Sequence, residues 1–348
     1  MVNLYSDTQT RPTEDMRRAI AAAEVGDEQR FEDPTTVRLQ ERVAELLGHE
    51  AGLFLPSGTM CNEIALRLHA RPGGDELILD RTAHPIIAEA GGPAQSSQLM
   101  IQALDGEQGV FSPAALRAAI RPASRYVPRS RVVSVEQTTN MGGGRIWPLE
   151  TVRGVVEVAR EHGLRKHMDG ARLMNAVVAS GVPAAEFAGG FDTAWIDFTK
   201  GLGAPVGAVL AASRELIEEA WRWKQMLGGA LRQSGIVAAG CLYALDHHVD
   251  RLADDHENAR ALAEGLGELG CEVVPPDTNI VIFSVPGGSA ESMEETAPGG
   301  FVESMARRAV ELSGTPDGRV RAVTHLDVDR AGIEEALGAA RAVLSAGA

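Results

Sequence analysis

Short apolar runs alternate with segments of helical periodicity along most of the first 250 residues. The apolar runs predict strands at 51–55, 76–79, 131–135, 166–169, 193–197 and 206–210. Helical periodicity predicts helices between them, for example from about residue 59 to 70 and from 148 to 162. Strands that alternate with helices are typical of a largely parallel sheet covered by helices, so the chain is predicted to be an α/β protein.

One helix has clear start and stop signals. Asp33 can cap the first turn, Pro34 suits that turn, and Gly48 can end the helix. The apolar positions between them repeat at helical spacing and would form the buried face: Leu39, Val43, Leu46 and Leu47.

The pattern changes in the C-terminal part of the chain. Residues 213–269 are mostly helical, and then strands are predicted at 272–274, 279–283 and 320–324, with helices at about 301–312 and at the C-terminus. We therefore expect a large domain over 1–250 and a small α+β domain over 251–348. The segment 286–300, rich in Gly, Ser, Glu and Pro, is expected to be an exposed or mobile loop.

Charge and composition narrow the class of protein. The net charge of −15 argues against nucleic acid or an anionic membrane as the main partner. The three cysteines are far apart and form no CxxC pair, so neither a disulfide framework nor a cysteine zinc site is expected. The first residues lack the features of a signal peptide, and no run is long enough to span a membrane. These features predict a soluble cytoplasmic protein.

Two residues suggest the chemistry. One predicted strand ends at Asp169, and Lys200 follows shortly after another strand about thirty residues later. Pyridoxal phosphate needs a lysine to form a Schiff base with its aldehyde and an acid to keep its pyridine nitrogen protonated. A single lysine before a glycine is weak evidence, because most lysines are solvated surface charges. The pairing of Lys200 with Asp169 favours a catalytic lysine.

Other residues fit the same cofactor. Gly58 and Thr59 open a helix after a strand, where backbone N–H groups can bind phosphate; the alternative is an ordinary helix cap. His84 can stack on the cofactor ring and act as an acid or base, or it can be a solvated loop histidine. Arg172 and Arg321 can bind a carboxylate, or can form surface salt bridges.

Two further patterns are weaker. The glycine-rich segment 140–145 does not match the GxGxxG pattern of dinucleotide-binding proteins. His247, His248 and His256 lie in an acidic helical region, where a solvated face is favoured over a metal site. We therefore expect no metal centre.

Taken together, the motifs resemble the threonine aldolase family, the β-eliminating-lyase branch of the fold-type I pyridoxal phosphate enzymes. The resemblance extends over nearly the whole chain. It is carried by the segments 6–13 (SDTQTRPT), 32–34 (EDP), 55–60 (LPSGTM), 89–92 (EAGG), 142–145 (GGGR), 169–173 (DGARL), 200–207 (KGLGAPVG) and 226–233 (MLGGALRQ).

The resemblance implies a fold and a set of roles. The fold is a mostly parallel seven-stranded sheet between helices, with a small C-terminal domain. Lys200 would bind pyridoxal 5'-phosphate covalently, Asp169 would pair with its pyridine nitrogen, and His84 would stack on its ring. Gly58 and Thr59 would hold the phosphate. Three residues would bind the substrate carboxylate: Ser6, Arg172 (which also belongs to the cofactor site) and Arg321. Members of the family are commonly homotetramers, dimers of dimers with shared active sites, and Arg232 would reach the phosphate of a neighbouring subunit.

The chain departs from the family pattern around the substrate. Arg30 and Phe31 stand where the family usually has tyrosine and glycine, and Thr139 stands where it often has histidine. Residues 85–88 (PIIA) replace a segment that is commonly rich in tyrosine. Arg30 could bind an acidic substrate side chain, or it could face solvent or pair with Glu28 or Glu32.

The implied activity is a lyase reaction: retro-aldol cleavage of a β-hydroxy-α-amino acid to glycine and an aldehyde. Threonine or allo-threonine is the default substrate. The altered pocket keeps two alternatives open, cleavage of a bulkier or anionic substrate and β-elimination from a different β-substituted amino acid. A non-enzymatic binding role would require damage at Lys200 or Asp169, and both are present.

Overall fold

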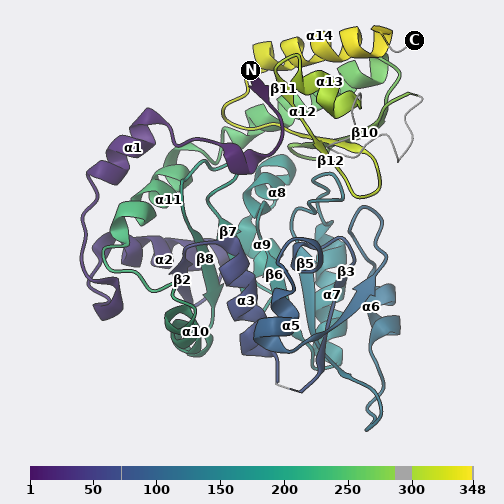
Figure 1. The fold of residues 1–348 in the computed structure, drawn as a ribbon. Helices are drawn as coiled ribbons and strands as arrows, with labels where there is room; N and C mark the ends of the chain where they lie inside the picture. The colour runs from purple at the N-terminus through teal and green to yellow at the C-terminus, as the bar shows by residue number, and fades with distance from the viewer. Residues whose placement is uncertain (72, 287–299, 347–348) are drawn as a thin grey trace.

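The computed structural model describes residues 1–71, 73–286 and 300–346. Figure 1 shows a large central sheet with helices on both sides and a smaller unit stacked on one end of it. Both chain termini lie at the smaller unit. No helix within these described ranges is both long and apolar enough to cross a membrane.

The central sheet has seven strands in the order β2-β8-β7-β6-β5-β3-β4. Only β8, among its strands, runs antiparallel to its neighbours β2 and β7. The strands are β2 (Ala51–Leu55), β3 (Asp75–Asp80), β4 (Met100–Leu104), β5 (Arg129–Glu136), β6 (Arg165–Asp169), β7 (Thr193–Asp197) and β8 (Ala208–Ala212). The predicted α/β class and the mostly parallel sheet are confirmed. The edge strand β4 was not predicted from the sequence; its first two residues, Met100 and Ile101, are exposed.

Helices cover both faces of this sheet (Figure 1). They are α1 (Glu14–Ala21), α2 (Pro34–Leu47), α3 (Gly58–His69), α4 (His84–Ile87), α5 (Gly92–Ser97), α6 (Pro113–Ala119), α7 (Leu149–Glu161), α8 (Leu173–Ser180), α9 (Ala184–Ala188), α10 (Arg214–Met226) and α11 (Gly235–His247), with the short 3-10 turns η1 (Asp7–Gln9) and η2 (Glu28–Arg30).

The start and stop signals of α2 act as predicted. The Asp33 carboxylate accepts the Thr36 backbone N–H at 2.9 Å, and Gly48 ends the helix at φ 72°. Leu39, Val43 and Leu47 are fully buried in the main core.

The smaller unit contains α12 (Leu252–Glu268), β9 (Glu272–Val274), β10 (Ile280–Ser284), α13 (Phe301–Ala306), β11 (Val310–Glu311), β12 (Ser313–Gly314), β13 (Val320–Val323) and α14 (Arg330–Ala346). Four of its strands form an antiparallel sheet in the order β12-β13-β10-β9. Of the predicted loop 286–300, residues 287–299 lie outside the described part of the chain.

The helix predicted at 301–312 is wrong in its second half. It ends at Ala306, Ala309 takes a positive φ of 60°, and β11 follows. β11 pairs in parallel with the N-terminal strand β1 (Val2–Asn3), so a partner more than 300 residues away replaces the helical hydrogen bonds. Val2 and Leu4 pack in the hydrophobic core of the C-terminal unit. The division into domains at residue 250 stays a prediction, and the first residues of the chain bridge its two parts.

Candidate active site

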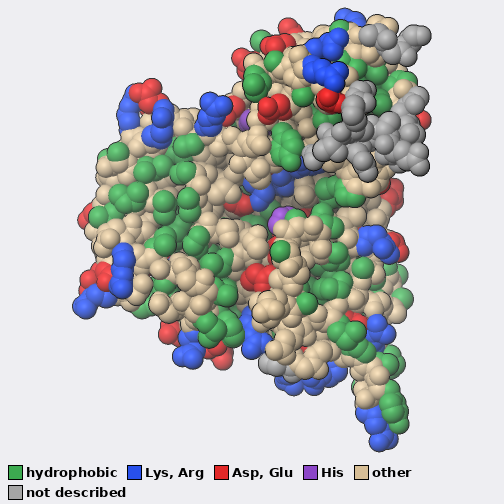
Figure 2. Space-filling view, in the orientation of Figure 1, with side chains coloured by type: hydrophobic (Ala, Val, Ile, Leu, Met, Phe, Trp, Pro, Cys, Tyr) green, Lys and Arg blue, Asp and Glu red, His purple; other side chains and the backbone are tan. Residues whose placement is uncertain are grey.

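A cavity of about 260 Å³ contains five of the residues predicted from the sequence. They are Ser6, His84, Arg172, Lys200 and Arg321. Four of them come from different parts of the main body, and Arg321 comes from β13 of the smaller unit. Figure 2 shows basic and histidine side chains gathered in the hollow between these two parts of the molecule.

Two acids of this site lie at the ends of parallel strands. β6 ends at Asp169 and β7 ends at Asp197, and the carboxyl ends of parallel strands meet at one edge of a sheet. Asp169 is only 1% exposed. Its Oδ1 accepts the Ala171 backbone N–H at 3.0 Å, and its Oδ2 accepts from Nδ2 of Asn62 at 2.8 Å. These two bonds fix the direction of the carboxylate.

Asn62 connects the two acids of this site. Its Nδ2 donates to Asp169 and also to Oε1 of Glu89, at 2.7 Å. Its carbonyl oxygen accepts from Nε1 of Trp195 at 2.8 Å and lies 2.9 Å from Nε2 of His167. The sequence analysis did not find Asn62, because a single amide in an amphipathic helix carries no local signal of such a role.

Two neutral histidines are linked to Asn62 through hydrogen bonds. His167 Nδ1 and His69 Nε2 each lie 2.8 Å from the hydroxyl of Thr193. Burial lowers the pKa of His167 to about 3 and that of His69 to about 4. Because both rings are therefore neutral, His167 donates from Nε2 to Asn62 and accepts from Thr193, whose oxygen accepts from His69. The amide of Asn62 thus has one fixed orientation.

His84 begins α4 and is held by Glu89. Its Nδ1 lies 2.7 Å from Oε1 of Glu89, so Nδ1 donates to this carboxylate and Nε2 remains for the cavity. Burial by itself would lower the pKa of His84, but the hydrogen bond to Glu89 and the charges of Asp169 and Glu136 outweigh it and raise this pKa. His84 is therefore not the solvated loop histidine of the alternative interpretation.

Arg172 forms a buried ion pair that the sequence did not predict. Its Nε and Nη2 donate to the two carboxylate oxygens of Asp7, at 2.8 and 2.6 Å. Burial would raise the pKa of Asp7, yet the charge of Arg172 lowers it well below the ordinary value. The surface salt bridge proposed as the alternative for Arg172 is thus wrong. Arg172 also lines the cavity.

Arg321 is placed to receive an anion. Its Nη1 donates to the carbonyl of Tyr5 at 3.2 Å, and its Nη2 donates to Oδ1 of Asn140 at 2.9 Å. Its buried Nε has no hydrogen-bond partner among the described residues. Burial, followed by repulsion from Arg172, lowers the pKa of Arg321 to about 10. A buried donor without a partner is costly, and a substrate carboxylate would satisfy it.

Glu136 and Thr139 lie at the same edge of the sheet. Glu136 lines the cavity and sits beside Asp169 in the β5–β6 register. Burial and the charge of Asp169 raise its pKa to about 7. Thr139 is 1% exposed, and its hydroxyl has no hydrogen-bond partner among the described residues. Glu136 is a second titrating group of the cavity that the sequence analysis missed.

The predicted phosphate site lies one helical turn before Asn62. Gly58 and Thr59 are the first residues of α3, whose N-cap Ser57 accepts the Met60 N–H. The first N–H groups of a helix have no intrahelical acceptor and can bind an anion. A Cβ on residue 58 would lie 2.3 Å from the indole of Trp195, so this position requires glycine. The backbone geometry fits a phosphate group.

Lys200 contacts a further acid. Its Nζ donates to Oδ2 of Asp197 and lies 5.9 Å from the centre of the Trp195 ring. The groups at and near the cavity match pyridoxal phosphate: the Lys200 amine for the aldehyde, the Asp169 carboxylate for the pyridine nitrogen, and the first N–H groups of α3 for the phosphate. Asp169, Gly58 and Thr59 do not themselves line the cavity.

Two predicted residues lie away from this cavity in the single chain. Arg30 pairs with Glu32 at 3.0 Å, which is the alternative that the sequence left open. Arg232 is 66% exposed and its guanidinium lies 3.7 Å from the carboxylate of Asp27. Both belong to one local structure, because the N–H of Glu28 donates to the carbonyl of Arg232.

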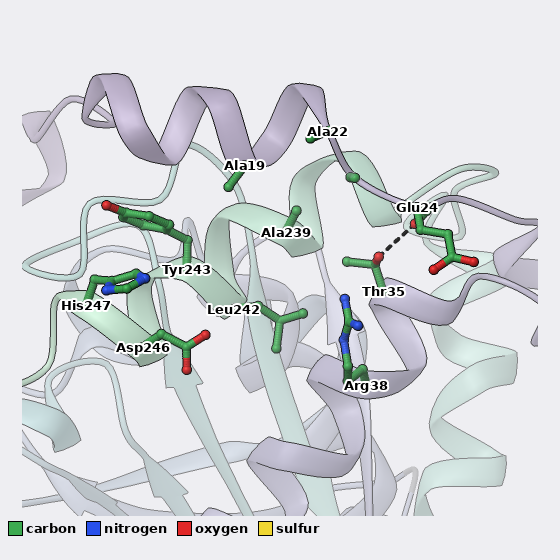
Figure 3. Close-up of a pocket in the computed structure, with 11 residues that line it drawn as sticks. Ala19, Ala22, Glu24, Thr35, Arg38, Ala239, Leu242, Tyr243, Asp246 and His247 are labelled. Atoms are coloured by element: carbon green, nitrogen blue, oxygen red, sulfur yellow. Dashed lines mark hydrogen bonds between the residues drawn. The ribbon is translucent and has the colours of Figure 1, made fainter.

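A second cavity, of about 300 Å³, lies between α1, α2 and α11 (Figure 3). Tyr243 and His247 line it with ring centres 4.4 Å apart, and none of the predicted site residues does. His248 and His256 are buried and hydrogen-bonded to Leu202 and Asn175, so their predicted solvated position is wrong. Within the described ranges no group of side chains could hold a metal ion.

The chain is similar to several known proteins. The family model described as β-eliminating lyase matches residues 3–286. The low specificity L-threonine aldolase of Escherichia coli (strain K12) is 40% identical over 346 residues, 99% of this chain and 100% of that protein. A probable low-specificity L-threonine aldolase of Arabidopsis thaliana is 38% identical and covers 97% of this chain and 95% of its own length. The solved threonine aldolase of Leishmania major has a TM-score of 0.83 at 18% identity, and covers 99% of this chain and 100% of its own.

Proposed function

This chain belongs to the β-eliminating lyase family and, within it, to the threonine aldolases, and from this premise we propose its reaction. It is a pyridoxal-phosphate-dependent lyase that cleaves a β-hydroxy-α-amino acid, by default threonine or allo-threonine, to glycine and an aldehyde. The observation that carries this proposal is the single cavity in which Lys200, His84 and two arginines meet.

The cofactor would be held by groups from three elements. Lys200 would bind its aldehyde, Asp169 its pyridine nitrogen, and the start of α3 its phosphate. When bound, pyridoxal phosphate supplies a positively charged ring that accepts the electrons of the bond that breaks. Asp169 supports this role because Asn62 and the Ala171 N–H orient its carboxylate before any ligand arrives.

The arginines would set the orientation of the substrate. The unpartnered Nε of Arg321 can bind the carboxylate, with Arg172 and Ser6, which line the same cavity, as further groups. A carboxylate fixed in this way limits rotation about the bonds at Cα, so the Cα–Cβ bond can be held perpendicular to the cofactor plane. Orientation of this kind supports the chemical step as well as affinity.

His84 would accept the proton of the β-hydroxyl group. Its Nδ1 donates to Glu89, so the neutral ring presents the lone pair of Nε2 to the cavity. The proton moves from the hydroxyl oxygen to Nε2 as the Cα–Cβ bond breaks and the aldehyde forms. Glu89 stabilises the resulting imidazolium.

A product assay tests the reaction. The purified protein with added pyridoxal phosphate is offered threonine, allo-threonine and bulkier β-hydroxy amino acids, and glycine, aldehyde, ammonia and keto acid are measured. Glycine and aldehyde in equal amounts are expected. Ammonia and a keto acid would instead establish the alternative, β-elimination, for which the buried unpartnered hydroxyl of Thr139 is the motivating observation.

We also propose a homotetramer, a dimer of dimers with shared active sites. Arg232 supports it, since this arginine is two-thirds exposed and far from satisfied by Asp27 in the single chain. Exposed apolar side chains lie in the neighbouring segments: Phe31, Met226, Leu227 and Ile236. A contact there would bury these side chains and bring Arg232 to the phosphate of a neighbour.

A cytoplasmic location is also proposed. Cys61, Cys241 and Cys271 are all free and buried, which is typical of proteins from a reducing compartment.

A further inference from the structure

We propose that Asp197 is a positioning residue for Lys200. Its carboxylate holds the amino group of Lys200 in the charged form and at the cavity whenever that group is not bonded to the cofactor. The inference rests on the proposed function, in which Lys200 binds the cofactor. Asp197 ends β7 and Lys200 follows three residues later, and their side chains are 3% and 16% exposed.

The direction of this carboxylate is fixed by local structure. Oδ1 of Asp197 accepts the backbone N–H of Thr199 at 2.8 Å and its hydroxyl at 2.7 Å. Oδ2 is therefore turned toward Lys200, whose Nζ donates to it. β7 lies between β6 and β8, so the carboxylate stands on a rigid strand end.

Other charged groups around Lys200 are engaged elsewhere. Asp7, from η1, is near enough to feel the charge of Lys200, but both its oxygens are bonded to Arg172. Cys61, from α3, is a neutral thiol because burial raises its pKa. Asp169, on β6, is bonded to Asn62 and the Ala171 N–H. The remaining charged or titratable groups that line the cavity are Tyr5, His84, Glu136, Arg172 and Arg321. Cys241, from α11, is near enough to feel the charge of Asp197, and burial raises the pKa of its thiol.

Within the described part of the chain, Asp197 is thus the carboxylate that accepts a hydrogen bond from Lys200. Two consequences follow. When a substrate amino group displaces Lys200, the released ammonium is retained beside the cavity rather than rotating into solvent. When Lys200 is bonded to the cofactor, the carboxylate favours a positive charge on the same nitrogen. An opposite charge in contact moves such an equilibrium by about one to three pH units.

The test is a pH titration of the visible absorption band of the cofactor-loaded protein. In Asp197→Asn, which keeps the shape and an acceptor for Thr199 but lacks the charge, we expect the midpoint to fall by about one to three pH units. Because Asp197 does not line the cavity, kcat should fall more than KM rises. Asp192→Asn is the matched control. Asp192 pairs with Lys166 beside the start of β7, roughly 16 Å along the strand from Asp197. The titration midpoint of this variant should equal that of the wild type.

Two more variants keep the proposal testable if Asp197→Asn does not fold. Asp197→Glu retains the charge and should retain the midpoint, whereas Asp197→Ser should show the fall. An unmoved midpoint in either uncharged variant, or an equal fall in Asp197→Glu or Asp192→Asn, overturns the role of Asp197.

Measurements on the wild-type protein distinguish a failure of the Asp197 proposal from a failure of the proposed function. If the wild type binds the cofactor and makes glycine and aldehyde while the uncharged variants keep its midpoint, only the role of Asp197 is wrong. If the titration midpoint of the absorption band depends on Asp197 but the wild type releases no aldehyde, the proposed reaction is wrong and the positioning role stands. If it binds no cofactor at all, both are wrong.

Discussion

Asn62 donates a hydrogen bond to Asp169, with 2.8 Å between Nδ2 and Oδ2, across 107 residues of sequence. The same nitrogen donates to Glu89, which in turn holds His84. One buried amide therefore orients both the acid proposed to face the cofactor nitrogen and the histidine proposed to move the substrate proton. This arrangement makes the geometry of the site sensitive to a residue that lines no part of the cavity.

Replacement of Asn62 by leucine should destabilise the fold. The change leaves Asp169, Glu89, the Trp195 N–H and the His167 N–H without their partner. Buried polar groups that lose a partner cost about 1–3 kcal/mol each, so we expect the free energy of unfolding to fall by at least about 2 kcal/mol. Chemical denaturation measures this. Asn258→Leu, at an amide with a single bond to Val328, is the control and should cost less.

Lys200 should carry the cofactor. Borohydride reduction of the loaded protein followed by peptide mapping should place the label on this residue. Lys166 and Lys224 serve as internal controls because they pair with Asp192 and Glu28. A label on either of them, or a colourless protein after addition of pyridoxal phosphate, would contradict the assignment.

Asp169→Asn should lose most turnover while much of the cofactor binding remains. The amide can still accept the Ala171 N–H, but it cannot stabilise a protonated pyridine nitrogen. Loss of one preorganised electrostatic contact costs about a hundredfold or more in kcat. Steady-state kinetics and cofactor titration measure the two effects separately. Turnover close to wild type would rule out the charge on Asp169 as the source of the effect.

The pH dependence of kcat/KM should identify the base. His84 accepts a proton only when it is neutral, so kcat/KM rises as the pH passes upward through its raised pKa. Glu89→Gln removes the charge that raises this pKa and should move the rise to lower pH. Glu136, with a pKa of about 7, titrates in the same range, so Glu136→Gln is the necessary control. If Glu136→Gln abolishes the rise and Glu89→Gln leaves it in place, His84 is not the base.

A shared active site should allow complementation between subunits. Lys200→Ala removes the residue that binds the cofactor, and Arg232→Ala removes the arginine proposed to reach the neighbour's phosphate. Each variant should be inactive, and a mixture of the two should recover part of the activity, because some sites then receive both residues. A monomer by light scattering would exclude this arrangement.

Arg30 should select an acidic side chain if the assembly brings it to a neighbour's site. We expect β-hydroxyaspartate to have a higher kcat/KM than threonine or phenylserine, and Arg30→Tyr to lower it about ten- to hundredfold. Arg153, which is exposed and pairs with Glu150, provides a control substitution. If threonine remains the best substrate and Arg30→Tyr leaves the order unchanged, the pair with Glu32 is the whole role of Arg30.

The sequence by itself determined most of the order of strands and helices, the start and end of α2, and five of the residues that line the cavity. These features follow from local physics. Helical and strand periodicities depend on neighbouring residues, and the cap at Asp33 and the end at Gly48 depend on backbone groups within one turn. Asp169 and Lys200 could be proposed from the sequence because cofactor chemistry requires those residue types at strand ends.

Only the tertiary structure decided how these pieces are connected. β11 is a strand because β1, from the opposite end of the chain, supplies its hydrogen bonds. Arg172 is buried because Asp7 accompanies it, and Asn62 matters because Asp169 and Glu89 meet it in the core. A single polar residue in a helix or strand shows no periodicity that names its partner. The contribution of such a residue to the stability of the fold depends on its burial, and burial depends on contacts between segments far apart in the sequence.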